Sequence, residues 1–113
     1  MVVVLDESLI NLRTLVAGKS TDCLLDSGAS HNFLSVEWCK ENSIEYESGD
    51  WFSVRLADGQ EVPVVAKLRC FVDLGPMKTA LTFYILDCSV PCVLGLPFLQ
   101  TVNPTIDWTN HTV

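Results

Sequence analysis

The segment LLDSGASH, residues 24–31, places the carboxylate of Asp26 at the end of an apolar strand and follows it with a hydroxyl residue and small residues. A carboxyl group in such a position is partly removed from water, which raises its pKa, and a second carboxylate alongside raises one pKa of the pair further. The two groups then share one proton near neutral pH and act together as an acid and a base. Gly28 permits a tight turn and a close approach to the backbone. The segment therefore predicts a site of acid–base chemistry at Asp26.

Turn signals recur at short intervals along the chain, a rhythm typical of an all-β domain. The alternating residues 10–16, a Gly-containing turn at 17–20 and the apolar residues 21–25 predict a hairpin whose second strand runs into Asp26. The dipeptide Asp58-Gly59 between two β-rich runs predicts another hairpin. The expected strands are residues 10–16, 21–25, 51–56, 61–65, 67–74, 79–86 and 105–108.

Short helices are expected at two places between the strands. Ser35 can accept a hydrogen bond at the start of a helix over residues 36–41, and Asn42 ends it. Pro97 suits the first position of a helical turn over residues 97–101, because its fixed φ matches a helix and its missing N–H has no partner there.

Length and composition indicate one folded domain over residues 1–113. The chain has 49% apolar residues, enough for a core, but it is short enough for oligomerisation to add stability. Its net charge is −7 and its Lys and Arg residues form no cluster, so we expect no nucleic-acid partner. The apolar run of residues 1–5 is too short for a signal peptide or a membrane span, so we expect no membrane partner.

The cysteines predict reduced thiols and no metal site. The five cysteines include no C-x-x-C pair, and only two histidines accompany them, which disfavours zinc. Cys23, Cys70 and Cys92 lie in apolar, strand-like contexts, where a reduced cysteine serves as a small core residue. We therefore expect an intracellular, cytoplasmic protein with neither a metal nor a cofactor.

Several motifs together resemble those of one protease family. Residues 26–29, Asp-Ser-Gly-Ala, resemble the Asp-Thr/Ser-Gly-Ala signature of retropepsins, the aspartic proteases of retroviruses and LTR retrotransposons. Val93-Leu94-Gly95 resembles the second apolar-apolar-Gly element of that family, and residues 56–60 resemble its flap hairpin. Residues 94–99 and 103–108 are similar to the closing region of Ty3/gypsy-type retroelement proteases. The resemblance spans nearly the whole chain.

The resemblance implies an all-β, closed β-barrel-like protomer with one or two short helices, acting as a homodimer. Only Asp26 is followed by a hydroxyl residue and Gly, so the second carboxylate would come from the partner's Asp26. One carboxylate of such a pair activates a water for attack on a peptide carbonyl while the other protonates the oxygen. The implied activity is that of an aspartic endopeptidase that processes a polyprotein.

The resemblance also assigns the residues of the site. Asp26, Ser27 and Gly28 are the expected catalytic residues, with Ser27 bonding across the subunit interface. Terminal strands at residues 2–5 and 105–108 are the expected interface. The residues expected to bind the peptide are Ala29, Ser30, Ala57, Asp58, Gly59, Pro91 and Val93.

Two departures from the retroviral pattern keep alternatives open. Ser30 and Leu96 stand where retroviral members usually carry an Asp and an Arg, so both members of a charge pair are missing together. The alternatives are a catalytically silent dimeric interaction module of a domesticated retroelement protein and a peptide-binding β-domain unrelated to proteases. A hydrolase triad at His31 is disfavoured, because no Gly-x-Ser-x-Gly elbow is present.

Overall fold

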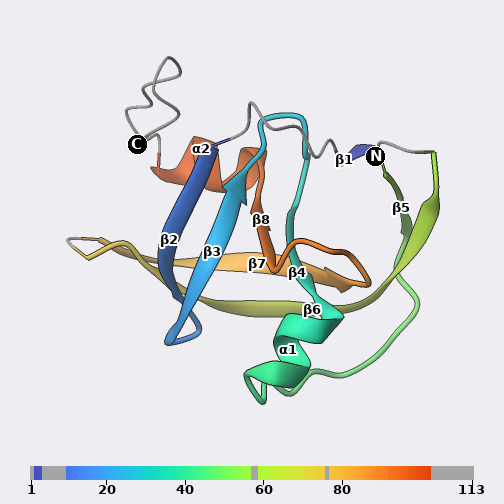
Figure 1. Cartoon of the computed structure of the whole chain (residues 1–113), viewed down its shortest axis with the longest axis horizontal. Coiled ribbons are helices and arrows are strands. Elements are labelled where there is room, and N and C mark those ends of the chain that lie inside the picture. Colours follow the sequence, from blue (N-terminus) through green and yellow to red (C-terminus); the bar gives the residue numbers. More distant parts are fainter. Residues whose placement is uncertain (1, 4–9, 57–58, 76, 103–113) are drawn as a thin grey trace.

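A computed structural model of the chain describes residues 2–3, 10–56, 59–75 and 77–102 (Figure 1). Within these ranges it contains eight strands and two short helices. Residues 57–58 of the expected second hairpin and the expected strand at 105–108 lie outside the described residues. The elements are β1 Val2–Val3, β2 Ile10–Val16, β3 Lys19–Leu25, β4 Asn32–Ser35, α1 Val36–Glu41, β5 Ser53–Leu56, β6 Glu61–Asp73, β7 Lys78–Leu86, β8 Cys92–Leu94 and α2 Leu96–Val102.

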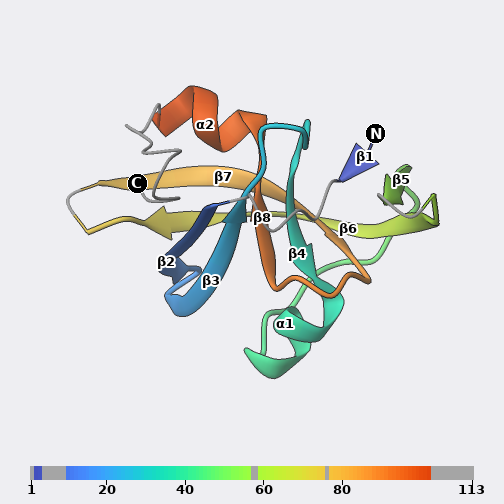
Figure 2. The ribbon, with the colours of Figure 1, turned by 45° about the horizontal axis from the view of Figure 1, so that its top comes forward.

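Six of the strands close into a barrel (Figures 1 and 2). They follow the order β6-β2-β3-β8-β4-β7, and β7 pairs again with β6 to complete the ring. Outside the ring, β5 pairs antiparallel with β6, and Val2–Val3 pair parallel with β5 of the same chain. The expected all-β, closed protomer with two short helices is confirmed.

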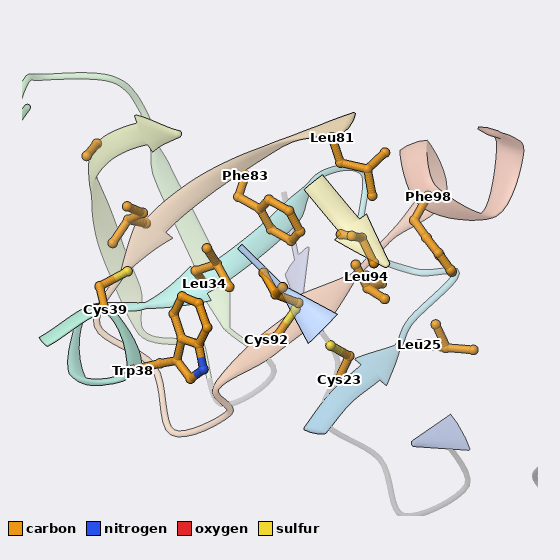
Figure 3. Close-up of a cluster of buried hydrophobic side chains, with 14 residues drawn as sticks. Cys23, Leu25, Leu34, Trp38, Cys39, Leu81, Phe83, Cys92, Leu94 and Phe98 are labelled. Atoms are coloured by element: carbon orange, nitrogen blue, oxygen red, sulfur yellow. The ribbon is translucent and has the colours of Figure 1, made fainter. Parts of the chain in front are cut away.

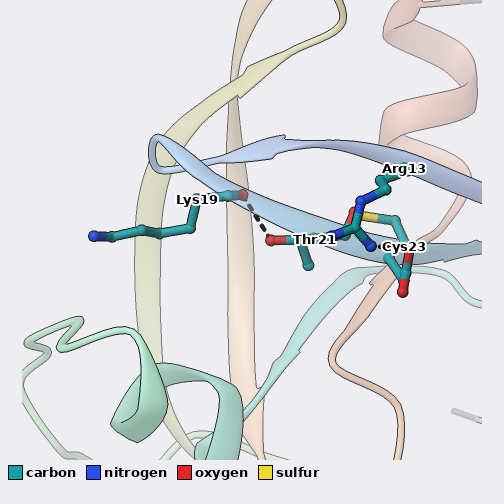
Figure 4. A network of polar contacts seen from close by, with 5 residues as sticks. Arg13, Lys19, Thr21 and Cys23 are labelled. Carbon is teal, nitrogen blue, oxygen red and sulfur yellow. Dashed lines mark hydrogen bonds and ion pairs between the residues drawn. The ribbon is translucent and has the colours of Figure 1, made fainter.

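The hairpin of β2 and β3 brings the chain to Asp26. A two-residue turn joins the strands, with φ of 50° at Ala17 and 79° at Gly18, the left-handed conformation that matches the twist of a β-hairpin. Within β3, Thr21 is buried and its hydroxyl donates to the carbonyl oxygen of Lys19 at 2.8 Å, as Figure 4 shows. The buried hydroxyl is thus satisfied within its own strand.

Strand β8 comes from late in the sequence and lies between β3 and β4 (Figure 1). It runs parallel to β3, pairing Cys23 with Cys92 and Leu25 with Leu94, and antiparallel to β4. Because parallel strands end on the same side of a sheet, the residues after β3 and after β8 meet at one edge of the barrel.

Three strands differ from the sequence-based expectation. Strand β8 was not expected, because its three residues are too few to show a period. Strand β4 was not expected, because all four residues of Asn32–Ser35 are buried and show no alternation of apolar and polar side chains. Strand β6 is continuous over Glu61–Asp73, where two strands had been expected. A shift of register between Val64 and Ala66 bends this strand and explains the interrupted pattern.

Both helices agree with their sequence signals. Helix α1 has the expected bounds, and the N–H of Trp38 donates to the Ser35 hydroxyl at 2.9 Å. Asn42 caps its other end. Helix α2 is longer than expected by a residue at each end, since the N–H of Leu99 donates to the carbonyl of Gly95 at 3.1 Å. In the described part of the chain, no helix has the length and apolar character needed to cross a bilayer.

The buried apolar side chains form two clusters. The main core fills the barrel and receives Trp38 from α1 and Phe98 from α2, and Figure 3 shows its members. The hairpin core lies between the residues after Asp26 and the β5–β6 hairpin. The main core consists of Val16, Cys23, Leu25, Leu34, Trp38, Cys39, Ala66, Val72, Leu81, Phe83, Ile85, Cys92, Leu94 and Phe98. The hairpin core consists of Ala29, Phe33, Val54, Val62, Val64, Leu86 and Val93.

Candidate active site

Asp26 follows the last residue of β3 and is only 2% exposed. Its N–H donates to the carbonyl of Leu94 at 3.0 Å, and its own carbonyl accepts from the N–H of Ala29 at 3.1 Å. Its carboxylate oxygen Oδ1 accepts a hydrogen bond from the N–H of Gly28 at 2.8 Å. Backbone bonds on both sides therefore fix the position of this carboxylate.

Gly95 lets the segment after β8 pack closely against the segment after Asp26. The N–H of Leu96 donates to the carbonyl of Ala29 at 2.9 Å, directly after β8. A Cβ atom on Gly95 would lie 2.3 Å from the carbonyl oxygen of His31 and 2.5 Å from that of Ala29. Since both obstacles are backbone atoms, only glycine permits this approach.

Asn32 completes this junction, and sequence analysis did not identify it. The side chain is 1% exposed, its Oδ1 accepts from the N–H of Gly95 at 2.9 Å, and its Nδ2 donates to the carbonyl of Thr82 at 3.2 Å. An amide carries its acceptor and its donor on separate atoms and so serves both partners, whereas an ionised carboxylate of the same length can only accept. The one sequence feature that could have indicated Asn32 is its position as a polar residue directly before the apolar pair Phe33-Leu34.

Of the four residues after Asp26, only Ala29 is buried. Ser27, Gly28 and Ser30 are exposed in this single chain, whereas Ala29 is fully buried. A Cβ atom on Gly28 would lie 3.1 Å from Oδ1 of Asp26, which leaves little room for a side chain. The exposed hydroxyl of Ser27 is accessible to a second subunit, and its role at an interface stays a prediction.

The remaining expected residues fall in three places. Ala29 and Val93 are brought together in the hairpin core, where Val93 is 2% exposed. Pro91 is exposed, and its carbonyl accepts from the N–H of Ser35 at 3.0 Å. Gly59 is exposed in the β5–β6 hairpin with φ +88°. Ala57 and Asp58 lie outside the described residues.

His31 packs among aromatic rings next to the site. Its ring centroid lies 5.2 Å from that of Phe52 and 5.0 Å from that of Tyr84. Burial against these rings lowers the pKa of His31, because it disfavours the charged imidazolium. The position of this ring suits packing better than a triad with Ser27 or Ser30.

All five cysteines are free thiols, and burial raises the pKa of Cys39 and Cys70 to about 11. Among the described residues, no group of three or more His, Cys, Asp or Glu side chains is placed to hold a metal ion.

Comparisons with known proteins agree with this geometry. The fold is similar to that of EIAV protease complexed with the inhibitor HBY-793, with a TM-score of 0.70 and 17% identity over 89% of this chain and 94% of that one. A retropepsin-like aspartic protease from Rickettsia conorii gives a TM-score of 0.67 and 17% identity over 81% of this chain and 78% of that one. The retroviral protease-like domain of Ddi1 from Leishmania major gives a TM-score of 0.66 and 13% identity over 88% of this chain and 79% of that one. The family model of the PEG10/RTL1 protease domain matches residues 22–113. The chain therefore belongs to the PEG10/RTL1 protease domain family and is a retropepsin-like aspartic protease in fold.

Proposed function

We propose that this chain is one protomer of an aspartic endopeptidase. The observation that carries the proposal is the buried Asp26 carboxylate, fixed by the N–H of Gly28 at the point where β3 and β8 end together. Membership of a protease domain family supports it. The substrate is a peptide bond of a polypeptide, as in the processing of a polyprotein.

The proposed chemistry needs a second carboxylate, supplied by the partner's Asp26 in a homodimer. Two carboxyl groups at close range hold one proton between them, because two like charges so close are unfavourable. The ionised group takes a proton from a water molecule as its oxygen attacks the peptide carbonyl carbon. The protonated group donates its proton to the carbonyl oxygen, giving a neutral tetrahedral intermediate. That intermediate collapses by breaking the C–N bond, and the leaving nitrogen receives a proton from the pair.

The peptide in this proposal lies across the exposed Gly28 and Ser30, beneath the β5–β6 hairpin that contains Gly59. The hairpin acts as a flap. Ala29 and Val93 form the apolar floor from within the hairpin core. We further propose a reducing, cytoplasmic setting, which five free thiols support.

A catalytically silent dimeric module is the second candidate. Ser30 is exposed and Leu96 is 37% exposed, so neither of these positions supplies the charge that retroviral proteases usually carry there. An altered surface beside Asp26 is compatible with binding without cleavage.

Replacing Asp26 by asparagine separates these candidates. Asp26→Asn should lower peptide cleavage by about 10²–10⁴-fold or more, because it removes the shared proton while keeping side-chain volume. Asp22→Asn is the matched control, since Asp22 lies on β3, the strand that leads into Asp26, and is exposed in an ion pair with Arg13. Cleavage of a peptide library is the measurement, with thermal unfolding to check the fold.

Full activity in pure Asp26→Asn protein would overturn the endopeptidase assignment. No cleavage by the wild type, with an intact dimer in sedimentation, would establish the silent module. Cleavage by the wild type and Asp22→Asn alone supports the proposal.

The dimer should strengthen as salt rises. Two protomers of charge −7 repel each other, and this repulsion is screened over about 10 Å at 0.1 M salt but about 3 Å at 1 M. Sedimentation equilibrium at low and high sodium chloride measures the dimer constant. A constant that weakens in high salt would show that ion pairs, not apolar contacts, hold the subunits together.

A further inference from the structure

A pocket of about 470 Å³ lies beside the Asp26 loop and has a basic, hydroxyl-rich lining. It is bounded by His31 at the end of that loop, by Asn32 at the start of β4, by β6 and β7, and by α2, which Figure 2 shows above β7. We call it the basic pocket. Its polar lining includes His31, Lys67, Arg69, Thr82, Tyr84 and Thr101.

The strand register places the polar groups of β6 and β7 on one face. Lys67 pairs with Tyr84 and Arg69 pairs with Thr82 across the two strands. Alternate residues of a strand point to the same side, so both cations and both hydroxyls face the pocket together. Nη1 of Arg69 donates to the hydroxyl of Thr82 at 3.2 Å, which orients the guanidinium.

Among the described residues, neither Lys67 nor Arg69 of the basic pocket forms an ion pair with a carboxylate. The ion pairs between described residues are Arg13–Asp22 and Arg55–Glu61, and the pocket lining contains no Asp or Glu. Nζ of Lys67 instead lies 5.6 Å from the ring centroid of Trp51. The chain has 14 acidic but only 7 basic residues. With acidic residues in excess, two cations in one pocket without an acidic residue in its lining are unexpected.

The basic pocket is joined to the active-site junction through shared residues. His31 and Asn32 line the pocket, and Asn32 also accepts from the N–H of Gly95 at 2.9 Å. Pro97 lines it from the first turn of α2, directly after that junction. A polypeptide bound across Asp26 can therefore reach the pocket with residues a short way along the chain.

We propose that the basic pocket binds the carboxylate of a Glu or Asp side chain of the peptide substrate, away from the bond that is cleaved. The inference rests on the proposed function and names the class of substrate. Guanidinium and ammonium groups form charge-assisted hydrogen bonds with a carboxylate, stronger than those between neutral groups. The net charge of −7 disfavours acidic peptide residues at other places on the protein surface. The basic pocket therefore selects peptides by the position of their acidic residue relative to the cleaved bond.

A binding titration tests the pocket without using catalysis. The probe is acetyl-Glu-Glu-amide, added to the full chain while backbone amide resonances are followed by NMR. We expect saturable shifts at Lys67, Arg69 and Thr82, and affinity about tenfold lower in the double variant Lys67→Gln/Arg69→Gln. The matched control is Lys19→Gln/Lys40→Gln, which removes the same charge from exposed positions outside the pocket and should bind like the wild type.

Each other outcome of the titration has a defined meaning. Equal binding of acetyl-Gln-Gln-amide, or equal losses in the two double variants, would overturn the inference. Inorganic phosphate that binds where the glutamate probe does not would also overturn it, because the site would then favour a compact anion. Retained binding by Lys67→Arg supports a charge-based site and excludes loss through misfolding.

A cleavage assay then separates the pocket from the proposed function. Two peptides that differ by one Glu or Gln outside the cleaved bond should differ several-fold in kcat/KM, and Lys67→Gln/Arg69→Gln should remove the difference. Cleavage of both peptides at equal rates refutes the pocket but leaves the protease. Binding of the probe without any cleavage refutes the protease but leaves a carboxylate-binding pocket.

Discussion

The two apolar clusters of this small barrel differ in what surrounds them. The main core is enclosed by the barrel strands and closed by Trp38 of α1 and Phe98 of α2. The hairpin core includes Ala29, from the turn after Asp26, and lies against the partly buried rings of Phe52 and Tyr84. One cluster is bounded by structural elements on every side, whereas the other borders the site itself.

This difference assigns separate tasks to the two clusters. Loss of volume in the main core should mainly lower the free energy of unfolding, because its side chains fill the interior of the barrel. Loss of volume in the hairpin core also shifts Ala29, and through it the backbone that holds the Asp26 carboxylate. Strand β8 serves both, giving Cys92 and Leu94 to the main core and Val93 to the hairpin core.

Gly95→Ala should cause the largest loss of stability, because it disturbs β8, which contributes residues to both clusters. The added methyl would overlap backbone oxygens at 2.3 and 2.5 Å, so β8 and the Asp26 turn must move apart. We expect destabilisation above about 4 kcal/mol, measured by urea unfolding or by loss of soluble folded protein. Gly18→Ala is the control: no atom lies within 4 Å, and only its φ of +79° opposes the change. A folded, stable Gly95→Ala protein would contradict this account of the junction.

Phe83→Ala should be the most damaging truncation within the main core. Phe83 is fully buried, and removing its ring should cost about 3–5 kcal/mol of unfolding free energy. Phe71→Ala is the comparison, since Phe71 is 54% exposed on the neighbouring strand and should lose about 1 kcal/mol or less. Similar losses in the two variants would mean that the barrel interior is not the main source of stability.

Val62→Ala and Val72→Ala make the same change on one strand, β6, in different clusters. Each should lose about 1–3 kcal/mol of stability. Only Val62→Ala should also lower kcat/KM for apolar peptides, because Val62 belongs to the hairpin core. Peptide turnover well below the unfolding temperature is the measurement. Equal kcat/KM in the two variants would remove the functional distinction between the clusters.

The thiols of Cys39, in the main core, and of Cys70, which packs against it, predict a smaller, pH-dependent effect. Cys39 and Cys70 have a pKa of about 11, above the 9.0 of an unperturbed thiol. The unfolded chain therefore releases these protons first, so stability falls as pH rises from 9.0 towards 11 and is fully retained below 9.0. At pH 10 the loss should be on the order of 1 kcal/mol per thiol. Urea midpoints at pH 7.5 and 10, for wild type and Cys39→Ala, provide the check; the same pH effect in both would exclude this thiol as its source.

Much of the fold and the centre of the site could be predicted from local sequence. The β2–β3 hairpin and helix α1 with Ser35 as its cap both depend on neighbouring residues. Asp26 was identified because an acidic residue after an apolar strand and before Ser-Gly is an unusual local pattern.

The remaining features depend on contacts between distant segments. Strand β8 has only three residues, too few to show a period, and its partners β3 and β4 lie far away in sequence. The role of Asn32 cannot be predicted from its neighbours in sequence, because its side chain bonds to Gly95 and Thr82, which are distant along the chain. The basic pocket likewise combines the loop after Asp26, three strands and a helix.

The position of β8 between β3 and β4 also sets an order of events during synthesis. The ribosome releases β3 and β4 before β8. Because β8 lies between them in the sheet, β3 and β4 both lack this pairing partner until residues 92–94 have emerged. Contacts between such distant segments form late, because closing a long loop loses conformational entropy before any pairing is gained. The hydrogen bond from Asp26 to Leu94 is therefore absent from a nascent chain that ends before β8. On the proposed function, a growing polypeptide stays inert towards its neighbours until this strand has been made.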